Sequence, residues 1–341
     1  MSTGQIKLTM DRKKPIAVRS QNWPEETKPV VSIACLAYNH EKFIREAIES
    51  FLNQKTTFKV EILIHDDASD DRTAEIIREY AAEWPDLFSV ILQTENQYSK
   101  GKKPGELNLR RAKGKYIAIC EGDDYWTDPL KLQKQVKFLE SHPDYSVCVG
   151  GYTSYIEPEK RIGSTHISSI DSGSAEGFTF TLEEMKQTWL TKLLTALIRR
   201  DVLESFDPTV YRHYRDIHLF YHLINHHKAY YFKENFGVHR VHPGGVNSMK
   251  QGEVNHRAAY NCYRELYEQN RDEFTRYMCL KSTLGFFNYN LFHRYEGNRV
   301  KHNLRLYGEA VMLVRNLFEA KWLFTAFIKA SFKEKIKEIM S

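Results

Sequence analysis

The sequence lacks the features of a membrane-spanning or secreted protein. No apolar run approaches the roughly 18 residues that a transmembrane helix needs. Residues 1–11 are polar and contain no apolar stretch of the kind found in a signal peptide. These absences predict a cytoplasmic protein.

Disulfide and zinc patterns are also missing. The five cysteines are scattered, and most of them fall in apolar runs: Cys35, Cys120, Cys148, Cys262 and Cys279. None of them forms a CxxC pair or a cysteine–histidine spacing typical of zinc. Their odd number and apolar settings predict buried free thiols in a reducing compartment.

The excess of positive charge is small. Lysine and arginine number 49 and aspartate and glutamate 44, which gives a formal net charge of +5. This excess is compatible with anionic substrates or a membrane surface, but it is too small to indicate nucleic acid as a partner.

With 341 residues, 42% of them hydrophobic, the chain is long enough for one large domain or two ordinary ones.

The sequence does contain an alternation of strand-like and helix-like segments. Residues 30–36 and 60–64 are short apolar runs rich in β-branched side chains, as in buried strands. Between them, apolar residues recur at helical spacing over 43–52. The alternation continues with predicted strands at 88–92, 115–120 and 145–149 and predicted helices at 73–83 and 129–141. This pattern predicts an α/β fold with a mainly parallel sheet flanked by helices.

The second half of the chain has a different organisation. Residues 157–177 are rich in serine, glycine and charged residues, and we predict that they form a long loop that acts as a lid. A helix is predicted at 216–227, a strand or hairpin at 229–241, and helices beyond about residue 252. The sequence is therefore divided into an N-terminal arm (1–28), a main α/β domain (29–250) and a helical C-terminal region (251–341).

Polar clusters follow the ends of three predicted strands. They are Tyr38-Asn39, Asp66-Asp67 and the turn from Glu121 to Asp124. Ligands of parallel sheets bind beyond the carboxyl ends of the strands. Surface acidic turns would fall at either strand end at random, so this coincidence indicates a ligand site.

The turn from Glu121 to Asp124 places three carboxylates close together, on Glu121, Asp123 and Asp124. Like charges this close repel one another unless a cation or hydrogen-bond donors neutralise them. Carboxylate oxygens suit Mg²⁺ or Mn²⁺, and such ions usually complete their coordination with phosphate oxygens. The turn thus predicts a metal-held diphosphate. The alternative is an acidic turn that caps the helix beginning near Asp128-Pro129.

Several motifs occur in the same order as in family 2 glycosyltransferases of the GT-A fold. The sequence resembles in particular the bacterial enzymes of this family that build surface polysaccharides. The motifs are Pro29–Ile33, Tyr38-Asn39, the turn Asp66–Thr73, Lys113–Ile117 and Glu121–Trp126. The resemblance covers about residues 29–248. It implies an inverting, metal-dependent transfer from a nucleotide-sugar donor, a UDP-sugar, with Mn²⁺ or Mg²⁺ as cofactor. The implied acceptor is a glycan or a lipid-linked glycan.

The resemblance also implies which residues bind the nucleotide. Tyr38 and Asn39 would border the base, Asp67 would accept a hydrogen bond from the uracil N3–H, and Asn108 would face the nucleotide. Each has an alternative in local structure. Asn39 can cap a helix start, and the turn after Asp67 can cap the helix at 73–83 through Asp70 or Asp71.

The metal ligands implied by the resemblance are Glu121, Asp123, Asp124 and His242. Glu121 stands where the family more often has aspartate, and Asp123 and Asp124 would divide ribose and metal contacts between them. His242 follows a predicted strand and precedes Gly244-Gly245, which lets the backbone approach a ligand closely. Neutral imidazole is a competent metal ligand. A purely structural histidine is the alternative.

Asp216 matches the catalytic base of related enzymes. An inverting transfer needs one carboxylate that takes up the proton of the attacking acceptor hydroxyl. The alternative is an acidic residue at a helix N-terminus, which the helix dipole favours.

The end of the chain combines apolar and basic residues. An apolar stripe comprises Trp322, Phe324, Phe327, Ile328, Phe332, Ile336 and Ile339, with lysines around it. A basic amphipathic helix of this kind predicts peripheral contact with an anionic membrane. Packing on the protein or on a partner chain is the alternative.

Two other functions fit parts of the pattern. A nucleotidyltransferase also uses carboxylate-bound Mg²⁺, but it normally has a glycine-rich, basic phosphate loop after the first strand, and residues 36–40 are not such a loop. A catalytically silent module that binds sugar nucleotides or glycans would not need the candidate base.

Overall fold

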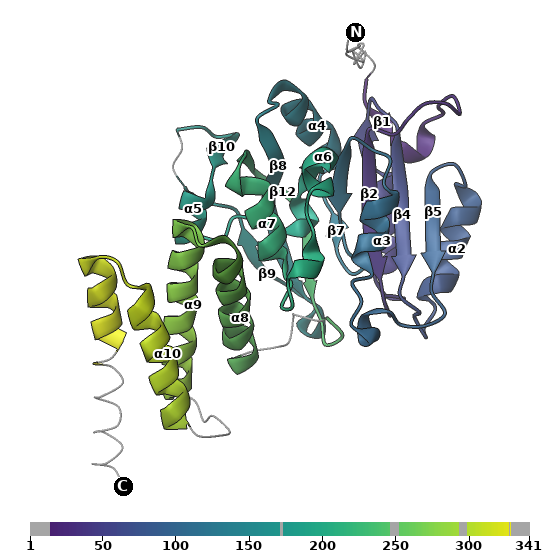
Figure 1. The fold of residues 1–341 in the computed structure, drawn as a ribbon. Coiled ribbons are helices and arrows are strands. Elements are labelled where there is room, and N and C mark those ends of the chain that lie inside the picture. Colours follow the sequence, from purple (N-terminus) through teal and green to yellow (C-terminus); the bar gives the residue numbers. More distant parts are fainter. Residues whose placement is uncertain (1–13, 171–172, 246–251, 293–298, 327, 329–341) are drawn as a thin grey trace. The chain divides into compact units, whose positions relative to one another are not determined.

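The computed structural model describes residues 14–170, 173–245, 252–292, 299–326 and 328. The chain divides into two compact units (Figure 1). The first comprises residues 1–181, 190–206 and 223–248, and the second comprises residues 182–189, 207–222 and 249–341.

The first unit is built on a ten-stranded sheet. Its strands are β2 (Val31–Ala37), β4 (Val60–Asp66), β5 (Phe88–Leu92), β6 (Tyr116–Ile119), β7 (Tyr125–Trp126), β8 (Tyr145–Ile156), β9 (Arg161–His166), β10 (Gly177–Phe180), β11 (Leu197–Arg199) and β12 (Lys228–Val241). The order is β10-β12-β8-β11-β6-β2-β4-β5, with β7 paired to β12 and β9 paired to β8. Strands β2, β4, β5 and β6 run parallel, as do β8 and β12. The predicted mixed, mainly parallel sheet is confirmed.

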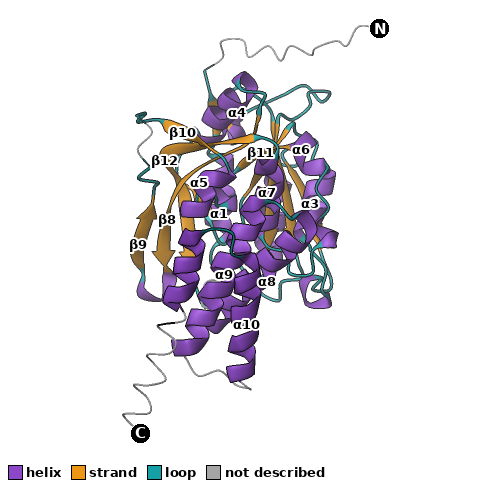
Figure 2. Ribbon diagram, turned by 60° about the vertical axis from the view of Figure 1, so that its left-hand side comes forward, coloured by secondary structure: helices purple, strands orange, loops and turns teal. Residues whose placement is uncertain are grey.

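Helices flank this sheet (Figure 2). They are α1 (Ile44–Leu52), α2 (Thr73–Glu83), α3 (Gly105–Arg111), α4 (Lys131–Ser141) and α6 (Arg200–Glu204), and a small separate pair is formed by β1 (Ile16–Ala17) and β3 (Lys55–Thr56). In α1, Ile44, Ile48 and Phe51 recur at helical spacing and are fully buried in the core. Burial of each such side chain is worth about 1.5–3 kcal/mol, which holds the helix against the sheet.

The register of the parallel strands brings their carboxyl ends to one edge. Ala37 at the end of β2 pairs with Asp66 at the end of β4. Beyond the strands, the Asp67 N–H donates to the Ala37 carbonyl at 2.9 Å, and the Gly122 N–H donates to the Leu36 carbonyl at 2.9 Å. The three polar clusters therefore lie on neighbouring turns, as the sequence predicts.

The long loop predicted at 157–177 is partly wrong. Strand β8 runs on to Ile156, and β9 returns antiparallel to it over Arg161–His166. Five of the six β9 side chains are exposed, and Gly163 is half-buried. Because β9 buries no apolar face, its sequence lacks the alternation by which strands are recognised.

The second unit is helical. Its helices are α5 (Leu182–Gln187), the first seven residues of α7 (Asp216–Asn225), α8 (Glu253–Asn270), α9 (Glu273–Phe292), α10 (Arg299–Leu313) and a helical stretch over 317–326. Leu280, Leu284 and Leu306 lie at the centre of its own apolar core. A buried ion pair joins Arg276 to Glu319 at 2.7 Å. No helix among the described residues combines the length and apolar character needed to cross a bilayer.

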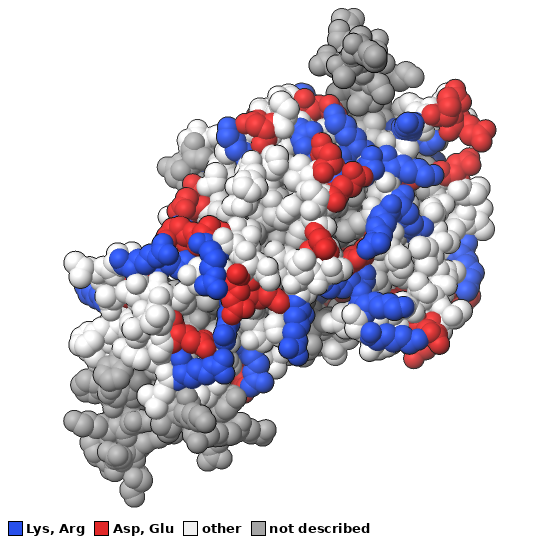
Figure 3. All heavy atoms as spheres, in the orientation of Figure 1, with Lys and Arg blue, Asp and Glu red and all other residues white. Residues whose placement is uncertain are grey.

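The C-terminal stripe falls partly outside the described residues. Phe327, Phe332, Ile336 and Ile339 lie there, whereas Trp322 is partly buried against the helical core. Seven described apolar side chains from residue 304 onward are exposed, and we refer to them together as the exposed apolar surface: Leu304 (68% exposed), Val311 (45%), Met312 (85%), Leu317 (90%), Phe318 (74%), Phe324 (61%) and Ile328 (38%). Elsewhere, acidic and basic side chains are interspersed over the face shown in Figure 3, consistent with the small net charge.

Candidate active site and metal centre

The turn after β2 is fixed by side chains of the turn after β4. Asn39 has a positive φ of 55°, its N–H donates to Ser69 Oγ, and its Oδ1 accepts from the Asp70 N–H at 3.0 Å. The next residue, His40, donates its N–H to Thr73 Oγ1 at 2.8 Å. These hydrogen bonds fix the backbone at residues 39 and 40, and so the direction of the His40 side chain.

The acidic turn after β6 packs closely on this region. A Cβ added at Gly122 would lie 2.9 Å from Ile44 Cδ1 and 3.0 Å from His40 Nδ1. A larger residue at 122 would therefore have to move the Ile44 or His40 side chain. The close approach brings Asp123, the next residue, beside His40.

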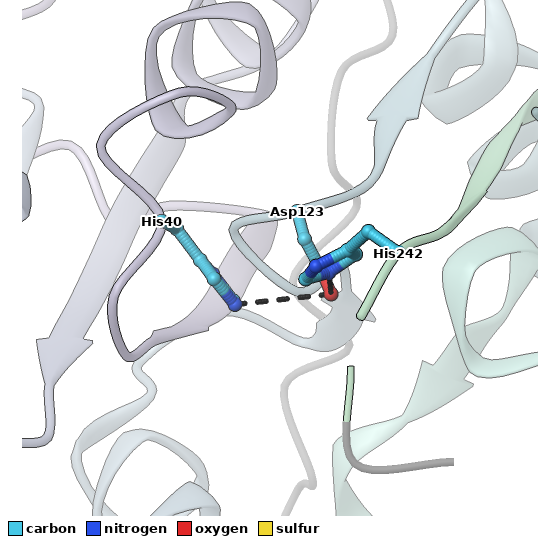
Figure 4. A group of neighbouring side chains, drawn as sticks. All are labelled: His40, Asp123 and His242. Carbon is cyan, nitrogen blue, oxygen red and sulfur yellow. Dashed lines mark hydrogen bonds and ion pairs between the residues drawn. The ribbon is translucent and has the colours of Figure 1, made fainter. Parts of the chain in front are cut away.

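His40, Asp123 and His242 converge from three elements (Figure 4). His40 follows β2, Asp123 follows β6 and His242 follows β12. The distance from His242 Nε2 to Asp123 Oδ2 is 3.0 Å, and that from His40 Nε2 to the same oxygen is 3.8 Å. One ligand atom from each residue lies within 4.8 Å of the others. We call these three residues the metal trio.

The metal trio has the properties of a divalent-cation site. Its side chains are only 13%, 11% and 7% exposed, and neither His40 Nδ1 nor Asp123 Oδ1 has a hydrogen-bond partner among the described residues. Buried polar atoms without partners are costly, and a bound cation compensates by charge neutralisation and direct ligation. Two imidazoles and one carboxylate suit Mn²⁺ better than Mg²⁺, which prefers oxygen ligands.

Electrostatics keep two members of the metal trio, His40 and Asp123, in a ligating form. Burial lowers the pKa of His40, although the Asp123 carboxylate opposes this, so the imidazole is neutral at neutral pH. Burial by itself would raise the pKa of Asp123, but the hydrogen bond from His242 and the nearby His40 outweigh it and lower the pKa. The carboxylate is therefore ionised, as metal ligation requires.

Asp124 is not part of the metal trio. It is 3% exposed, and its Oδ1 accepts from the Arg240 N–H at 2.8 Å and lies 3.1 Å from His239 Nδ1. The carboxylate therefore ties the acidic turn to β12. Glu121, which was also predicted as a metal ligand, is exposed and likewise lies outside the trio.

Arg240 clamps the acidic turn from the other side. Its guanidinium is nearly buried and donates to the Asp123 carbonyl at 2.8 Å and to Glu157 Oε1 at 3.0 Å, and it also pairs with Glu46. Arginine suits this position because its planar fork can serve several acceptors at once. The N-cap residue of α4 is Leu130, whose N–H donates to Asp128 Oδ1 at 2.8 Å, so the carboxylates of the acidic turn do not cap this helix.

The predicted nucleotide residues have different surroundings. Tyr38 is 45% exposed at the end of β2, and its ring is available for stacking. Helix α1 begins at Ile44 with Phe43 in the N-cap position, so the alternative role of Asn39 as a helix cap is wrong. Arg72 is the N-cap residue of α2, and Asp71 before it accepts from the N–H of Thr73, the first residue of the helix, at 2.8 Å, so this turn does contact the helix start.

Two of the predicted nucleotide residues are occupied in holding the fold. Asp67 is 2% exposed, and its two oxygens accept from the Gln97 N–H at 2.9 Å and the Tyr98 N–H at 3.0 Å. Asn108 is 1% exposed, donates to the Cys35 carbonyl at 2.7 Å and accepts from Arg111. Asp67 therefore fixes the loop beyond β4, and Asn108 fixes α3 against β2.

Asp216 is the first residue of α7 and belongs to the second unit. Its carboxylate is near Tyr263 of the same unit. Burial raises the pKa of Tyr263 most, and the negative charge of Asp216 raises it further. The carboxylate is half-buried beside residues of α8. Its assignment as the catalytic base stays a prediction.

His40 is the residue that the sequence predictions missed. The signal that could have found it is a histidine directly after the Tyr38-Asn39 pair at the carboxyl end of a strand. Arg240 is a second such residue, because the structure makes it the clamp of the acidic turn.

Comparison with known proteins identifies the family. The chain matches the Glycosyl transferase family 2 domain over residues 32–250. Since this match covers more than half of the 341 residues, the protein belongs to glycosyltransferase family 2. The resemblance seen in the sequence motifs is thereby confirmed.

Curated relatives match a part of the chain. An uncharacterized protein of Mycobacterium tuberculosis is 52% identical over 118 residues, which are 35% of this chain and 34% of the relative. WfaP of Escherichia coli, a UDP-Glc:α-D-GlcNAc-diphosphoundecaprenol β-1,3-glucosyltransferase, is 40% identical over 115 residues, or 33% of this chain and 42% of WfaP. The matched region thus spans less than half the length of either relative.

Solved structures share the fold over most of the chain. S. aureus TarS in complex with UDP-GlcNAc has a TM-score of 0.60 at 18% identity, covering 84% of this chain and 81% of that chain. The mannosyltransferase PcManGT from Pyrobaculum calidifontis, in complex with GDP-Man and Mn²⁺, has a TM-score of 0.52 at 18% identity, covering 92% and 90%. At this identity the likeness shows the fold alone, which is GT-A.

Proposed function

We propose that this protein is an inverting, metal-dependent glycosyltransferase. It transfers a sugar from a nucleotide-sugar, a UDP-sugar, to a hydroxyl of a glycan or lipid-linked glycan used in surface polysaccharide synthesis. The observation that carries the proposal is the metal trio at the carboxyl edge of a family 2 sheet. The bound ligands of TarS and PcManGT and the name of WfaP support the choice of substrates.

Each residue has a defined part in this proposal. His40, Asp123 and His242 would hold Mn²⁺ or Mg²⁺, and the ion would supply positive charge to stabilise the departing diphosphate. Tyr38 stacks on the base, and Asp67 supports the base directly or through the loop that it fixes at Gln97-Tyr98. Glu121 lies on the same turn and is exposed, so it can supply a further carboxylate to the ion or the ribose, while Asp124 holds the turn against β12.

Asp216 acts on the acceptor. Its carboxylate takes the proton of the attacking hydroxyl while the oxygen forms a bond to the anomeric carbon. The bond from that carbon to the nucleotide diphosphate breaks on the opposite face, so the configuration is inverted. No covalent enzyme intermediate is needed.

The donor is identified by a thermal-shift panel on the full chain. UDP-, GDP-, CMP- and dTDP-sugars are each tested with and without Mn²⁺, because a ligand that binds only the native state raises the melting temperature. We expect one UDP-sugar to raise it only when Mn²⁺ is present, and Asp123→Asn to abolish the shift. Asp70→Asn, an exposed carboxylate of a neighbouring turn, serves as the control.

Other outcomes would favour the rival functions. A melting-temperature shift with nucleotides, without sugar transfer to any acceptor tested, would favour a silent binding module. Release of pyrophosphate from a nucleoside triphosphate and a sugar phosphate would show a nucleotidyltransferase.

The exposed apolar surface suits contact with an anionic membrane, where a lipid-linked acceptor would lie. Leu317, Phe324 and Ile328 recur at helical spacing, and the exposed Lys321 lies on the same side of that stretch. We expect the full chain to sediment with phosphatidylglycerol vesicles more than with phosphatidylcholine vesicles. Replacing Leu317 and Phe324 by serine should abolish this difference, while Leu107→Ser on α3 should leave it unchanged.

A further inference from the structure

A hollow in the second unit has features of an anion site. It lies between residues 212–215, which precede α7, and the first half of α8, and its volume is 510 Å³. Three arginines line it, Arg212, Arg215 and Arg257, together with Tyr214 and Asn261. All of these residues belong to the second unit, so the hollow is formed without the metal trio.

The walls of the hollow are held in place by backbone contacts. The carboxylate of Glu265 on α8 accepts from the N–H groups of Arg212 at 2.6 Å and His213 at 2.9 Å. Cys262 Sγ lies 3.0 Å from the His213 carbonyl, to which the thiol donates. These contacts bind the 212–215 segment to α8, so the hollow is formed before any ligand enters.

The charge of the lining is positive. The lining contains three arginines and one carboxylate, that of Glu253, which pairs with Arg257. Three positive charges less one negative charge leave a net charge of +2 on the lining. Arginine forks bind phosphate oxygens in pairs, and the Tyr214 hydroxyl and Asn261 amide provide further donors.

The hollow adjoins the candidate base along the chain. Arg215 lines it, and Asp216 is the next residue, so the two Cα atoms are about 3.8 Å apart. The Asp216 carboxylate also raises the pKa of Cys262, which burial raises most, and Cys262 lines the hollow. A molecule whose anionic group is held by the arginines would therefore have its adjoining part near Asp216. A sugar bearing a phosphate or diphosphate has this form.

We propose that this hollow binds the phosphate or diphosphate of a phosphorylated acceptor sugar and so places its hydroxyl at Asp216. The proposal rests on the proposed function for the identity of the acceptor. The binding of the anion itself does not, because it requires neither donor nor metal. A lipid-linked sugar diphosphate and a soluble sugar phosphate share this chemistry.

Binding of inorganic pyrophosphate to the full chain, measured by calorimetry in EDTA, tests the anion site apart from the metal trio. Arg212→Gln, Arg257→Gln and the double variant are compared with Arg305→Gln, an arginine of α10 outside the hollow. We expect the double variant to weaken binding at least tenfold, and Arg305→Gln and Asp123→Asn to leave it unchanged. Absence of pyrophosphate binding, equal binding by the double variant, or tighter binding of glucuronate than of pyrophosphate would overturn the proposal.

Kinetics then separate the acceptor role from a merely structural one. With a lipid-linked or soluble phosphorylated acceptor, the double variant should raise the acceptor KM at least tenfold and leave the donor KM unchanged. Comparison of the two acceptors distinguishes the source of the phosphate. An unchanged acceptor KM would refute the acceptor role, whereas failure of any nucleotide-sugar to bind the wild type would instead refute the proposed function.

Discussion

At the scale of single residues, the candidate site depends on which oxygens and nitrogens already have partners. Asp123 and Asp124 are neighbours on one turn, yet Asp124 accepts from the Arg240 N–H while Asp123 Oδ1 has no partner among the described residues. This difference leaves Asp123 able to bind a cation, whereas Asp124 holds the turn against β12. The sequence motif cannot make the distinction, because both residues supply the same carboxylate.

His40 is predicted to be a third metal ligand. Replacing it by glutamine should lower the affinity for Mn²⁺ on the order of tenfold or more, since a ligating nitrogen is lost from a site of three. The affinity is measured by calorimetry or by the paramagnetic resonance signal of free Mn²⁺. His226→Gln, at an exposed histidine, is the matched control. If His40→Gln binds Mn²⁺ as tightly as His226→Gln, His40 is not a ligand, and Asp123 and His242 are the ligands left in the metal trio.

Residue roles could be predicted from the sequence only in part. Asp123 and His242 were placed at the site by motif and by their positions after predicted strands, and the metal trio includes both. His40 was missed because only the tertiary structure turns its ring toward Asp123. Asp67 and Asn108 stay predicted nucleotide residues, and the structure adds their burial and internal hydrogen bonds, which no linear pattern records.

At the scale of elements, the strands that carry the site were predictable because they are buried. The apolar runs of β2 and β4 and the helical spacing in α1 reflect burial on the two faces of a parallel sheet. Strand β9 was not predictable, since nearly all of its side chains are exposed. The same reasoning explains why the loop prediction at 157–177 failed.

Helix α4 contains a buried lysine that should make stability depend on pH. Lys131 is fully buried, its Nζ has no hydrogen-bond partner among the described residues, and it lies 4.2 Å from the centre of the Trp126 ring. Burial lowers the pKa of Lys131 to about 7. In the unfolded chain the pKa of lysine is about 10.4. Between these values the unfolded state binds more protons than the folded state.

The free energy of unfolding should therefore rise with pH from about 7 to about 10.4, by up to about 1.4 kcal/mol per pH unit from this group. Lys131→Met should stabilise the protein at pH 7, on the order of 3 kcal/mol, and remove this slope. Urea unfolding between pH 6 and pH 10 measures both effects. Lys137→Met, at an exposed position of the same helix, should keep the slope of the wild type. A slope that persists in Lys131→Met would contradict the assignment.

At the scale of the whole molecule, the two units carry different parts of the proposed reaction. The sheet unit holds the metal trio and the predicted nucleotide residues, whereas the helical unit holds Asp216 and the cationic hollow. Donor binding and acceptor activation are therefore expected to be separable by mutation. Variants of the metal trio should lose donor binding, and variants of the helical unit should retain it.

Asp216→Asn tests this separation most directly. The amide keeps the shape of the side chain but cannot take up a proton, so kcat should fall about 10²–10⁴-fold. The melting-temperature shift given by the donor and Mn²⁺ should remain, because the metal trio and Tyr38 belong to the other unit. The measurements are initial rates at saturating substrates and the thermal shift of the same preparation. If turnover survives in Asp216→Asn, another group takes the proton, and if the donor-induced shift is lost as well, the assignment of donor and acceptor roles to separate units is wrong.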